Sequence, residues 1–359
     1  MPESNASDPQ TSMGRQGARR FWPWIWSVTA LVVMLFVSVA AGPVSIPFPD
    51  LVRMLLDLFP GMVLDPNWER TFATIVYQIR LPNAVLMALT GMALGGSGAA
   101  YQGLFRNPLA DPYIIGVASG AGLGAVLAMA AHWPVNLMGM SIIPVAAFIA
   151  ALITVGIVYT IARVGRSTPV TTLILAGVAV SSFATAMTSL IMLLSTDELH
   201  RAVNWMVGGF ALGGWEPVLA SLPYFIIGLT VLALLGRHLN VLQFGDEQAR
   251  QMGLNVERSK MVIVVAASLV AATAVAFSGI IAFVGLIVPH VARLLWGPDY
   301  RRTLPLAILI GGSFLLLADI VARMILAPRA LPVGVVTSVV GAPFFLWLLY
   351  RAKGKVRVW

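Results

Sequence analysis

The apolar run from Phe21 to Gly42 contains no charged residue, and runs of the same kind recur along the chain as far as residue 350. About 20 consecutive apolar residues are enough for a helix to cross a bilayer. Inside lipid, every backbone N–H and C=O group must be satisfied within the structure, which an α-helix achieves by itself. Only 11% of the residues are charged, against about 25% in a typical soluble domain. The sequence therefore predicts an all-α integral membrane protein.

Ten membrane-spanning helices are expected, with polar or charged breaks between them. The run 261–292 is too long for one span and too short for two, which favours a full helix and a half-length helix hinged near Ser278 and Gly279. The first run could also be a secretory signal, but it is longer than the roughly 7–15 residues of a signal core, which favours a retained span. The other expected spans are 72–105, 112–131, 142–162, 170–194, 217–236, 303–323 and 333–350, and the polar segment 197–215 is expected to form a short amphipathic helix.

The charge distribution predicts the orientation. With both termini in the cytoplasm, 17 of the 23 Lys and Arg residues lie on the cytoplasmic side, as expected for a membrane protein. The net charge of +8 is therefore explained without a nucleic-acid partner. We divide the chain into a cytoplasmic N-terminal arm (1–20), which we expect to be disordered, a ten-span permease domain (21–352) and a cytoplasmic basic tail (353–359). The chain has no cysteine, which excludes disulfides and thiolate chemistry.

Prolines and glycines organise the region from Arg80 to Gly124. Pro108 and Pro112 cannot continue a helix, so residues 106–112 are predicted to form a tight turn between two buried helices. Glycine recurs every fourth residue at Gly91 and Gly95, and again at Gly116, Gly120 and Gly124. This spacing allows membrane helices to approach closely, and packing is the simplest interpretation.

Motifs of nucleotide-dependent or hydrolytic enzymes are missing from the sequence. It has no G-x-x-x-x-G-K-[ST] phosphate loop, no H-E-x-x-H, no nucleophile elbow and only three lysines. We therefore expect no catalytic residues, no metal site and no cofactor bound by this chain. If ATP drives transport, it binds a partner subunit. An ion-coupled secondary transporter is the alternative, and its ion sites would have to be Asp111 or Asp319.

The longest charged break contains the segment FGDEQARQMGLN (244–255). Its charged and apolar residues suit a short helix parallel to the membrane, which could transmit a push from a docked partner. A solvated charged loop is the competing interpretation.

Several motifs occur together in the order typical of one family: RNPLADP (106–112), LILAGVAVSS (173–182), NWMVGGF (204–210), FGDEQARQMGLN (244–255), FVGLIVPHVARLLWGPDYRR (283–302), LLADIVARM (316–324) and LPVGVVTSVVGAPFFLWLL (331–349). On these residues the chain resembles the FecCD-type permeases, the membrane subunits of ATP-binding-cassette (ABC) importers for ferric siderophores, haem and cobalamin. The resemblance covers roughly residues 70–352.

The resemblance implies roles for individual residues. The segment 244–255 would be the coupling segment that sits in a groove of the ATPase, through Gly245, Asp246, Glu247, Ala249, Arg250 and Gly253. The cytoplasmic gate would involve Asn107, Leu109, Thr171 and Thr172.

Two further roles concern the periplasmic side. Arg80 and Arg323 would dock a periplasmic binding protein, although they could also be interfacial anchors, and Asp319 is spaced to pair with Arg323 on one helix face. The family commonly has an arginine where this chain has Asn83, which leaves the docking charge weaker or moves it to Arg329. His200 is a candidate contact for haem in the outer vestibule.

The predicted protein is thus the permease subunit of an ABC importer in the bacterial inner membrane. It would act with a second permease copy (a homodimer is favoured), two ATPase subunits and a periplasmic substrate-binding protein. The cargo is expected to be a large iron chelate, haem or a ferric siderophore, with cobalamin as the alternative.

Overall fold

The structure is a computed structural model that describes residues 9–58, 68–133, 136–137, 140–195, 198–209 and 213–356. A short hairpin of β1 (Asn136–Leu137) and β2 (Met140–Ser141) precedes α6, and every other regular element described is helical. The helices are α1 (Pro9–Ala40), α2 (Phe48–Asp57), α3 (Arg70–Thr74), the π-helix η1 (Ile75–Arg80), α4 (Leu81–Leu104), α5 (Val117–Ala130), α6 (Ile142–Ala162), α7 (Val170–Leu194), α8 (Leu199–Met206), α9 (Glu216–Leu234), α10 (Gly236–Leu242), α11 (Asp246–Gln251), α12 (Val256–Ser278), α13 (Val284–Trp296), α14 (Tyr300–Met324) and α15 (Val333–Val356).

Helices of membrane-spanning character lie at all the expected positions. Seven in the described chain are long and apolar enough to cross a bilayer: those at Phe21–Ala40, Arg70–Leu104, Ile142–Ala162, Val170–Leu194, Glu216–Leu234, Val256–Ser278 and Tyr300–Met324. Three further apolar helices, α5, α13 and the Val333–Leu348 part of α15, are shorter, at 10–17 residues. The all-α membrane architecture is confirmed, whereas ten complete crossings stay a prediction.

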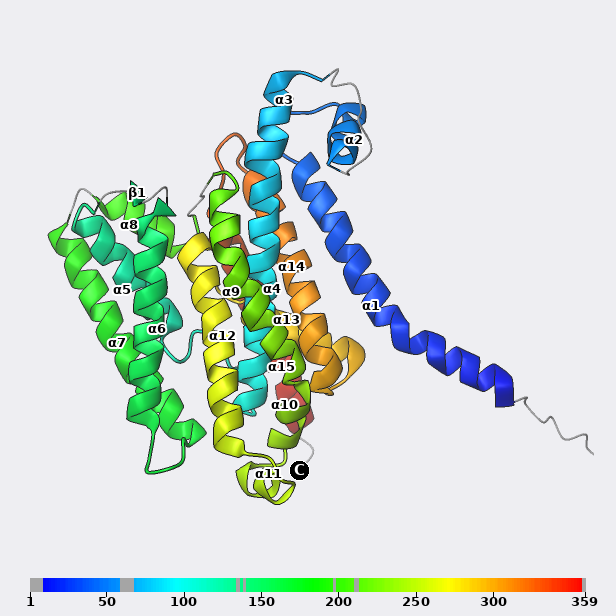
Figure 1. The fold of residues 1–359 in the computed structure, drawn as a ribbon, viewed down its shortest axis with the longest axis vertical. Coiled ribbons are helices and arrows are strands. Elements are labelled where there is room, and N and C mark those ends of the chain that lie inside the picture. Colours follow the sequence, from blue (N-terminus) through cyan, green and yellow to red (C-terminus); the bar gives the residue numbers. More distant parts are fainter. Residues whose placement is uncertain are drawn as a thin grey trace, which may run out of the picture.

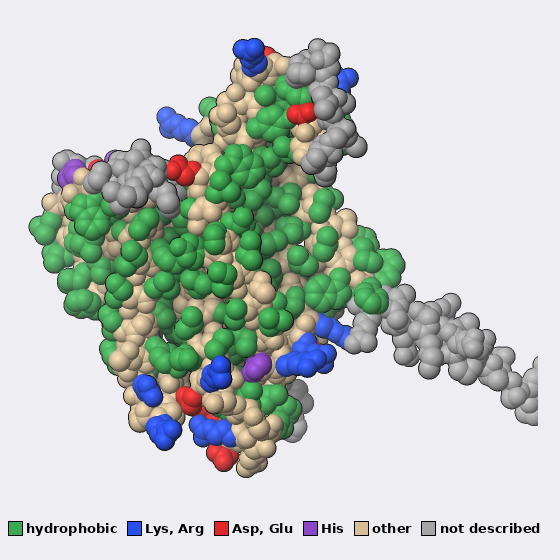
Figure 2. Space-filling view, viewed as in Figure 1, with side chains coloured by type: hydrophobic (Ala, Val, Ile, Leu, Met, Phe, Trp, Pro, Cys, Tyr) green, Lys and Arg blue, Asp and Glu red, His purple; other side chains and the backbone are tan. Residues whose placement is uncertain are grey.

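The two ends of the helical bundle differ. Figure 1 shows α2 and α3 at one end and α11 at the other, and we call these the α2 end and the α11 end. In Figure 2, hydrophobic side chains cover the middle of the visible face, while Lys and Arg gather at the α11 end. α1 begins at Pro9, within the predicted N-terminal arm, and residues 1–8 and 357–359 lie outside the described part of the chain.

α4 is the central helix, and it packs against α14, α12, α13 and α9 (Figure 1). Its glycines face neighbouring backbones. A Cβ at Gly91 would meet the carbonyl oxygen of Gly311, and one at Gly95 would meet that of Ala307. Because lipid removes the hydrophobic drive between helices, such close van der Waals contact is a main source of their attraction. The predicted packing role of these two glycines is confirmed.

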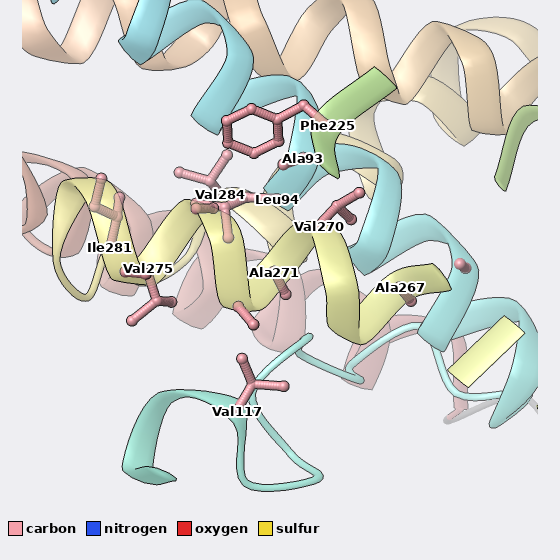
Figure 3. Close-up of a cluster of buried hydrophobic side chains, with 14 of the residues drawn as sticks. Ala93, Leu94, Val117, Phe225, Ala267, Val270, Ala271, Val275, Ile281 and Val284 are labelled. Atoms are coloured by element: carbon pink, nitrogen blue, oxygen red, sulfur yellow. The ribbon is translucent and has the colours of Figure 1, made fainter. Parts of the chain in front are cut away.

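α12 is the second buried helix. Figure 3 shows Val270, Ala271 and Val275 of α12 beside side chains from α4, α9 and the start of α5. Phe225 of α9 is fully buried in this cluster. The Tyr101 hydroxyl of α4 lies 2.7 Å from Ser268 Oγ of α12, so these two polar groups satisfy each other within the apolar core. The middle of α12 is therefore fixed to α4 inside the bundle.

The helix break predicted near Ser278 and Gly279 is confirmed. α12 ends at Ser278, and Gly279 adopts a φ of +76°, which lets the chain turn before α13 begins at Val284. The backbone of the break is satisfied by side chains from elsewhere. Tyr113 donates its hydroxyl to the Ile281 carbonyl at 2.9 Å, and Gln102 of α4 donates to the Gly285 and Leu286 carbonyls at 3.3 Å each. Non-helical backbone inside a membrane protein requires such partners.

The segment after α4 corrects one expectation. We expected a tight turn at 106–112 and a helix from residue 112, but α5 begins only at Val117. Tyr113 is held by its bond to Ile281, and its own N–H donates to Asp111 Oδ1 at 2.8 Å. These contacts keep residues 105–116 non-helical and lead the chain back into the bundle.

The second span is longer than one upright helix, as expected. α3, η1 and α4 run on without a break from Arg70 to Leu104 and project at the α2 end (Figure 1). Two carbonyls of the π-helix accept from the segment before α9: the Tyr77 carbonyl accepts from Trp215 Nε1 at 2.9 Å, and the Gln78 carbonyl accepts from the Gly214 N–H at 3.2 Å. The short helix expected within 197–215 is α8.

Candidate coupling and gating site

α11 is a short helix that two glycines isolate from its neighbours. Gly245, with a φ of +101°, precedes its first residue, and Gly253, with a φ of +83°, follows its end. Asp246 and Glu247 occupy the first turn and Arg250 the last, so each charge opposes the nearby end of the helix dipole. Ala249 is fully buried and anchors the helix to the body of the protein. The predicted coupling segment is therefore a discrete helix rather than a loop.

An exposed apolar surface flanks α11. Phe244 precedes the helix with 61% of its surface exposed, and Met252 follows it with 59% exposed. Glu247 and Arg250 beside them are also exposed. Large apolar side chains with a charged rim are typical of a protein docking site. We call Phe244, Met252 and the exposed residues of α11 the coupling surface.

The residues that precede α11 lie beside the end of α4 and the turn that follows it, residues 105–109, which we call the α4 turn. Gln243 donates its side-chain amide to the Gly103 carbonyl at 2.8 Å. The Arg106 guanidinium lies next to Gly245, where an added Cβ would stand 3.4 Å from its NH1 atom. Within the turn, the N–H of Leu109 donates to Asn107 Oδ1 at 2.9 Å, and Leu109 is 40% exposed. The turn that carries the predicted gate residues Asn107 and Leu109 thus lies beside Gly245, the residue that precedes α11.

Side chains of α12 link α11 to the turn before α7, residues 163–169, which we call the α7 turn. Lys260, on the first turns of α12, is 4% exposed and forms an ion pair with Asp246 of α11. It also donates to the Thr168 carbonyl at 3.1 Å. Glu257 accepts from the Thr168 N–H at 2.8 Å and from Arg250 at 3.3 Å. α11 is therefore linked through α12 to the α7 turn, which leads directly into the predicted gate residues Thr171 and Thr172.

Thr171 and Thr172 have different surroundings. Thr171 is exposed at the start of α7. Thr172 donates its hydroxyl to the Ala162 carbonyl at 2.9 Å and to the Pro169 carbonyl at 2.8 Å, so it closes the junction between α6 and α7. Thr171 is available to line a passage, and Thr172 fixes the turn from which it projects.

A cavity of about 290 Å³ lies between α5 and α7, beside the helix break. Hydroxyl groups dominate its polar lining, and Met206 and Ile280 supply much of the apolar part. A surface of hydroxyls and small apolar groups can pass a bulky solute without strong binding. The hydroxyl residues that line it are Tyr113, Ser119, Ser181, Thr185 and Thr188.

At the α2 end, two arginines hold the end of α1. Arg80 is 5% exposed, and its guanidinium donates to the carbonyls of Val39, Ala40 and Val44. Arg323 pairs with Asp319 at 2.9 Å and donates to the carbonyls of Ser38 and Ala41 at 3.1 Å each. Both cations thus lie at the negative end of the α1 dipole. Each has a structural task, and docking of a binding protein by these residues stays a prediction.

The remaining residues of the predicted outer surface are accessible. Arg329 is exposed in the segment between α14 and α15, and His200 is exposed on α8. Asn83, at the position that departs from the family pattern, lies 3.4 Å from Asp319 through its side-chain amide. Among the described residues, no group of three His, Asp or Glu side chains is placed to hold a metal ion.

Asp299 links α10 to α14 at the α11 end. Its carboxylate accepts from the Arg301 N–H at 2.9 Å and from the Asn240 side chain at 2.6 Å. Burial acts to raise the pKa of Asp299, but these hydrogen bonds and the Arg301 and Arg302 charges outweigh it and lower the pKa. A carboxyl group whose pKa is lowered in the folded state stabilises the fold at pH values above its unfolded-state pKa. This stabilisation is lost as the pH falls through the folded-state pKa.

Sequence reasoning assigned no individual role to four residues that join these elements: Gln102, Gln243, Glu257 and Lys260. Arg293 of α13 bonds to Gln102 Oε1, which fixes the half-length helix to α4. One signal was available for Lys260. It is one of only three lysines in the chain, and the apolar run of α12 begins directly after it. A long charged side chain at that position needs a partner.

Comparisons with known proteins agree with this geometry. Residues 30–351 match the FecCD transport family. The chain is 46% identical over 281 residues to a cobalamin import system permease of Halobacterium salinarum, covering 78% of this chain and 74% of the relative. It is 37% identical to a hemin transport system permease of Yersinia pestis, covering 90% and 93%. A solved structure described as an inward-facing metal-chelate type ABC transporter superposes with a TM-score of 0.78 at 30% identity, covering 91% of this chain and 98% of that one.

Proposed function

Because the chain belongs to the FecCD transport family and is therefore the membrane permease of an ABC importer, we propose that it moves a large metal chelate, with haem or a ferric siderophore as the first candidate. The observation that carries the mechanism is the position of α11. It has an exposed apolar surface beside it, the residue that precedes it lies next to the α4 turn, and it is linked through Lys260 to the α7 turn. Closure of a pair of ATPase subunits would push on α11 and reposition the α4 and α7 turns.

The α11 end is then the cytoplasmic side, with both termini in the cytoplasm of a bacterium and the α2 end facing the periplasm. The excess of Lys and Arg at the α11 end supports this orientation (Figure 2). A periplasmic binding protein would deliver the chelate to the α2 end. Arg329 and His200 are the accessible candidates there for contact with the protein or its cargo.

A second copy of the chain would complete the pathway. α7 buries little of its surface within a single chain, and the cavity lined by hydroxyl groups opens beside it. Pairing of two copies through a two-fold axis would place two such linings face to face. The pathway would then be built from groups that do not hold a chelate tightly, which suits a protein that must release its cargo.

Cobalamin is the second candidate cargo, and the 46% identity to a cobalamin import permease favours it. The ion-coupled alternative has less support. Asp319 is paired with Arg323, and Asp111 accepts a hydrogen bond from the Tyr113 N–H, so both carboxylates already have structural partners.

Uptake into proteoliposomes tests the proposal. The chain is reconstituted with its ATPase and binding protein and offered haem, a ferric hydroxamate siderophore or cobalamin in parallel. We expect ATP-dependent uptake of one iron chelate at least about tenfold above the rate without ATP. Uptake of cobalamin alone would replace the first candidate by the second. Uptake that follows an ion gradient and needs no ATPase would contradict the whole mechanism.

A further inference from the structure

The backbone of Thr168 is held from two sides by side chains of α12. Its carbonyl accepts from Lys260 Nζ at 3.1 Å, and its N–H donates to Glu257 Oε2 at 2.8 Å. Thr168 itself is 3% exposed. Because Pro169 follows directly and α7 begins at Val170, the two peptide groups that flank the Thr168 Cα set the position of the first turn of α7.

The same two side chains hold α11. Lys260 is paired with Asp246 in the first turn of α11, and Glu257 lies 3.3 Å from Arg250 in its last turn. α11 is therefore linked through Lys260 and Glu257 to the start of α7, although α11 and Thr168 are far apart in sequence. We call Lys260, Glu257 and Thr168 the connector.

The two links differ in strength. Arg250 is largely exposed, and such surface pairs contribute little. Lys260 is buried, so its ammonium depends on its partners. Loss of Asp246 would leave only Glu257, at 3.9 Å, as a counter-charge among the described residues. Loss of the Thr168 carbonyl would remove a hydrogen bond that water does not replace there. Lys260 is thus the stiffer of the two links.

We propose that Lys260 is a positioning residue that transmits the displacement of α11 to the α7 turn, so that partner docking and gate movement are one event. This inference rests on the proposed function, in which an ATPase docks on the coupling surface. Lys260 does not belong to that surface, because its side chain is buried. Removal of the Lys260 side-chain charge should therefore leave ATPase binding and ATP hydrolysis intact but reduce transport.

The first test is the variant Lys260→Met, which keeps the length of the side chain and removes its charge and donors. Reconstituted with the ATPase and binding protein, the variant is expected to bind the ATPase as the wild type does and to hydrolyse ATP at a similar rate. The number of cargo molecules imported per ATP is expected to fall about tenfold. The matched control is Arg258→Met, which removes an exposed cation from the same turn and should leave this ratio unchanged.

A second variant keeps the test valid if Lys260→Met does not fold. Asp246→Asn retains an acceptor for Lys260 but removes the opposing charge, and we expect the import ratio to fall about threefold. An unchanged ratio in a folded variant of either kind would overturn the inference.

A distance measurement separates transmission from a merely structural role. The chain has no cysteine, so spin labels can be attached only where they are introduced, at exposed Arg166→Cys in the α7 turn and Gln251→Cys on α11. Because Gln251 belongs to the coupling surface, the labelled protein is used only after it has been shown to bind the ATPase and import cargo as the unlabelled protein does. In the otherwise wild-type complex, the distance between the labels should stay constant when an ATP analogue is trapped, because the two elements move together. With Lys260→Met, it should change with the nucleotide. A distance that changes equally with and without Lys260 contradicts the connector, whereas failure of the wild-type complex to bind the ATPase or import cargo overturns the proposed function itself.

Discussion

The double substitution Phe244→Ser, Met252→Ser is expected to lower ATP-driven uptake at least about 100-fold in a protein that remains folded. Both side chains are mostly exposed in the single chain, so the substitutions remove no core packing. In the complex they would be the apolar anchors of the ATPase contact. Central anchors of this kind contribute about 2 kcal/mol each, and together they would weaken the contact by roughly two to three powers of ten.

Binding of the purified ATPase to the detergent-solubilised permease measures this effect separately from transport. The control is Phe244→Leu, Met252→Leu, which retains an apolar surface and should keep most of the affinity. Equal ATPase affinity of the serine variant and the wild type would show that the partner docks elsewhere.

Replacing Gly91 by valine is expected to destabilise the folded protein by about 3 kcal/mol or more. The new Cβ would coincide with the space taken by the Gly311 carbonyl, which belongs to the backbone of α14 and cannot rotate away. α4 and α14 would have to separate, and because α4 is the central helix, the strain would reach the whole bundle. A loss of this size is a large part of the roughly 5–15 kcal/mol that stabilises an ordinary fold.

Thermal unfolding of the purified protein in detergent measures the change, and we expect the midpoint to fall by about 6 °C or more. Gly156→Val on α6 is the matched control, because nothing lies within 4 Å of its added Cβ. It should unfold near the wild-type temperature. A Gly91 variant as stable as this control would mean that α4 and α14 do not pack as described.

Helices and helix ends were predicted correctly where they depend on the residues of the segment itself. The half-length helix α13 followed from the length of one apolar run, and the break near Gly279 followed from its residues. α11 was predicted from a charged segment bounded by two glycines. These features depend on neighbouring residues in the sequence, so the sequence alone reveals them.

The features that were missed depend on contacts between distant segments. Pro108 and Pro112 marked a turn, but its extension to residue 116 results from the bond between Tyr113 and Ile281, which lie 168 positions apart. Arg80 and Arg323 looked like surface charges at the ends of spans. Their bonds to the end of α1 show that a charge near a membrane boundary can serve as a helix cap as well as a docking group.

The connector of Lys260, Glu257 and Thr168 was also missed because it depends on contacts between distant segments. Nothing in the sequence near Thr168 indicates that its backbone is bonded to two side chains of α12, because the partners are about 90 residues away. The gate residues were predicted by resemblance and the coupling helix partly by pattern. The structure adds the links from α11 through α12 to the turn that leads into α7.

Photo-crosslinking from position 244 tests the central claim most directly. A benzophenone amino acid replaces Phe244 in the reconstituted, transport-active complex, and a second sample carries it at Trp133, an exposed position outside the coupling surface. Our account predicts a crosslink to the ATPase from position 244 and none from position 133. An active complex that gives no crosslink from position 244, or gives one from position 133, would contradict the assignment of α11 as the helix on which the ATPase acts.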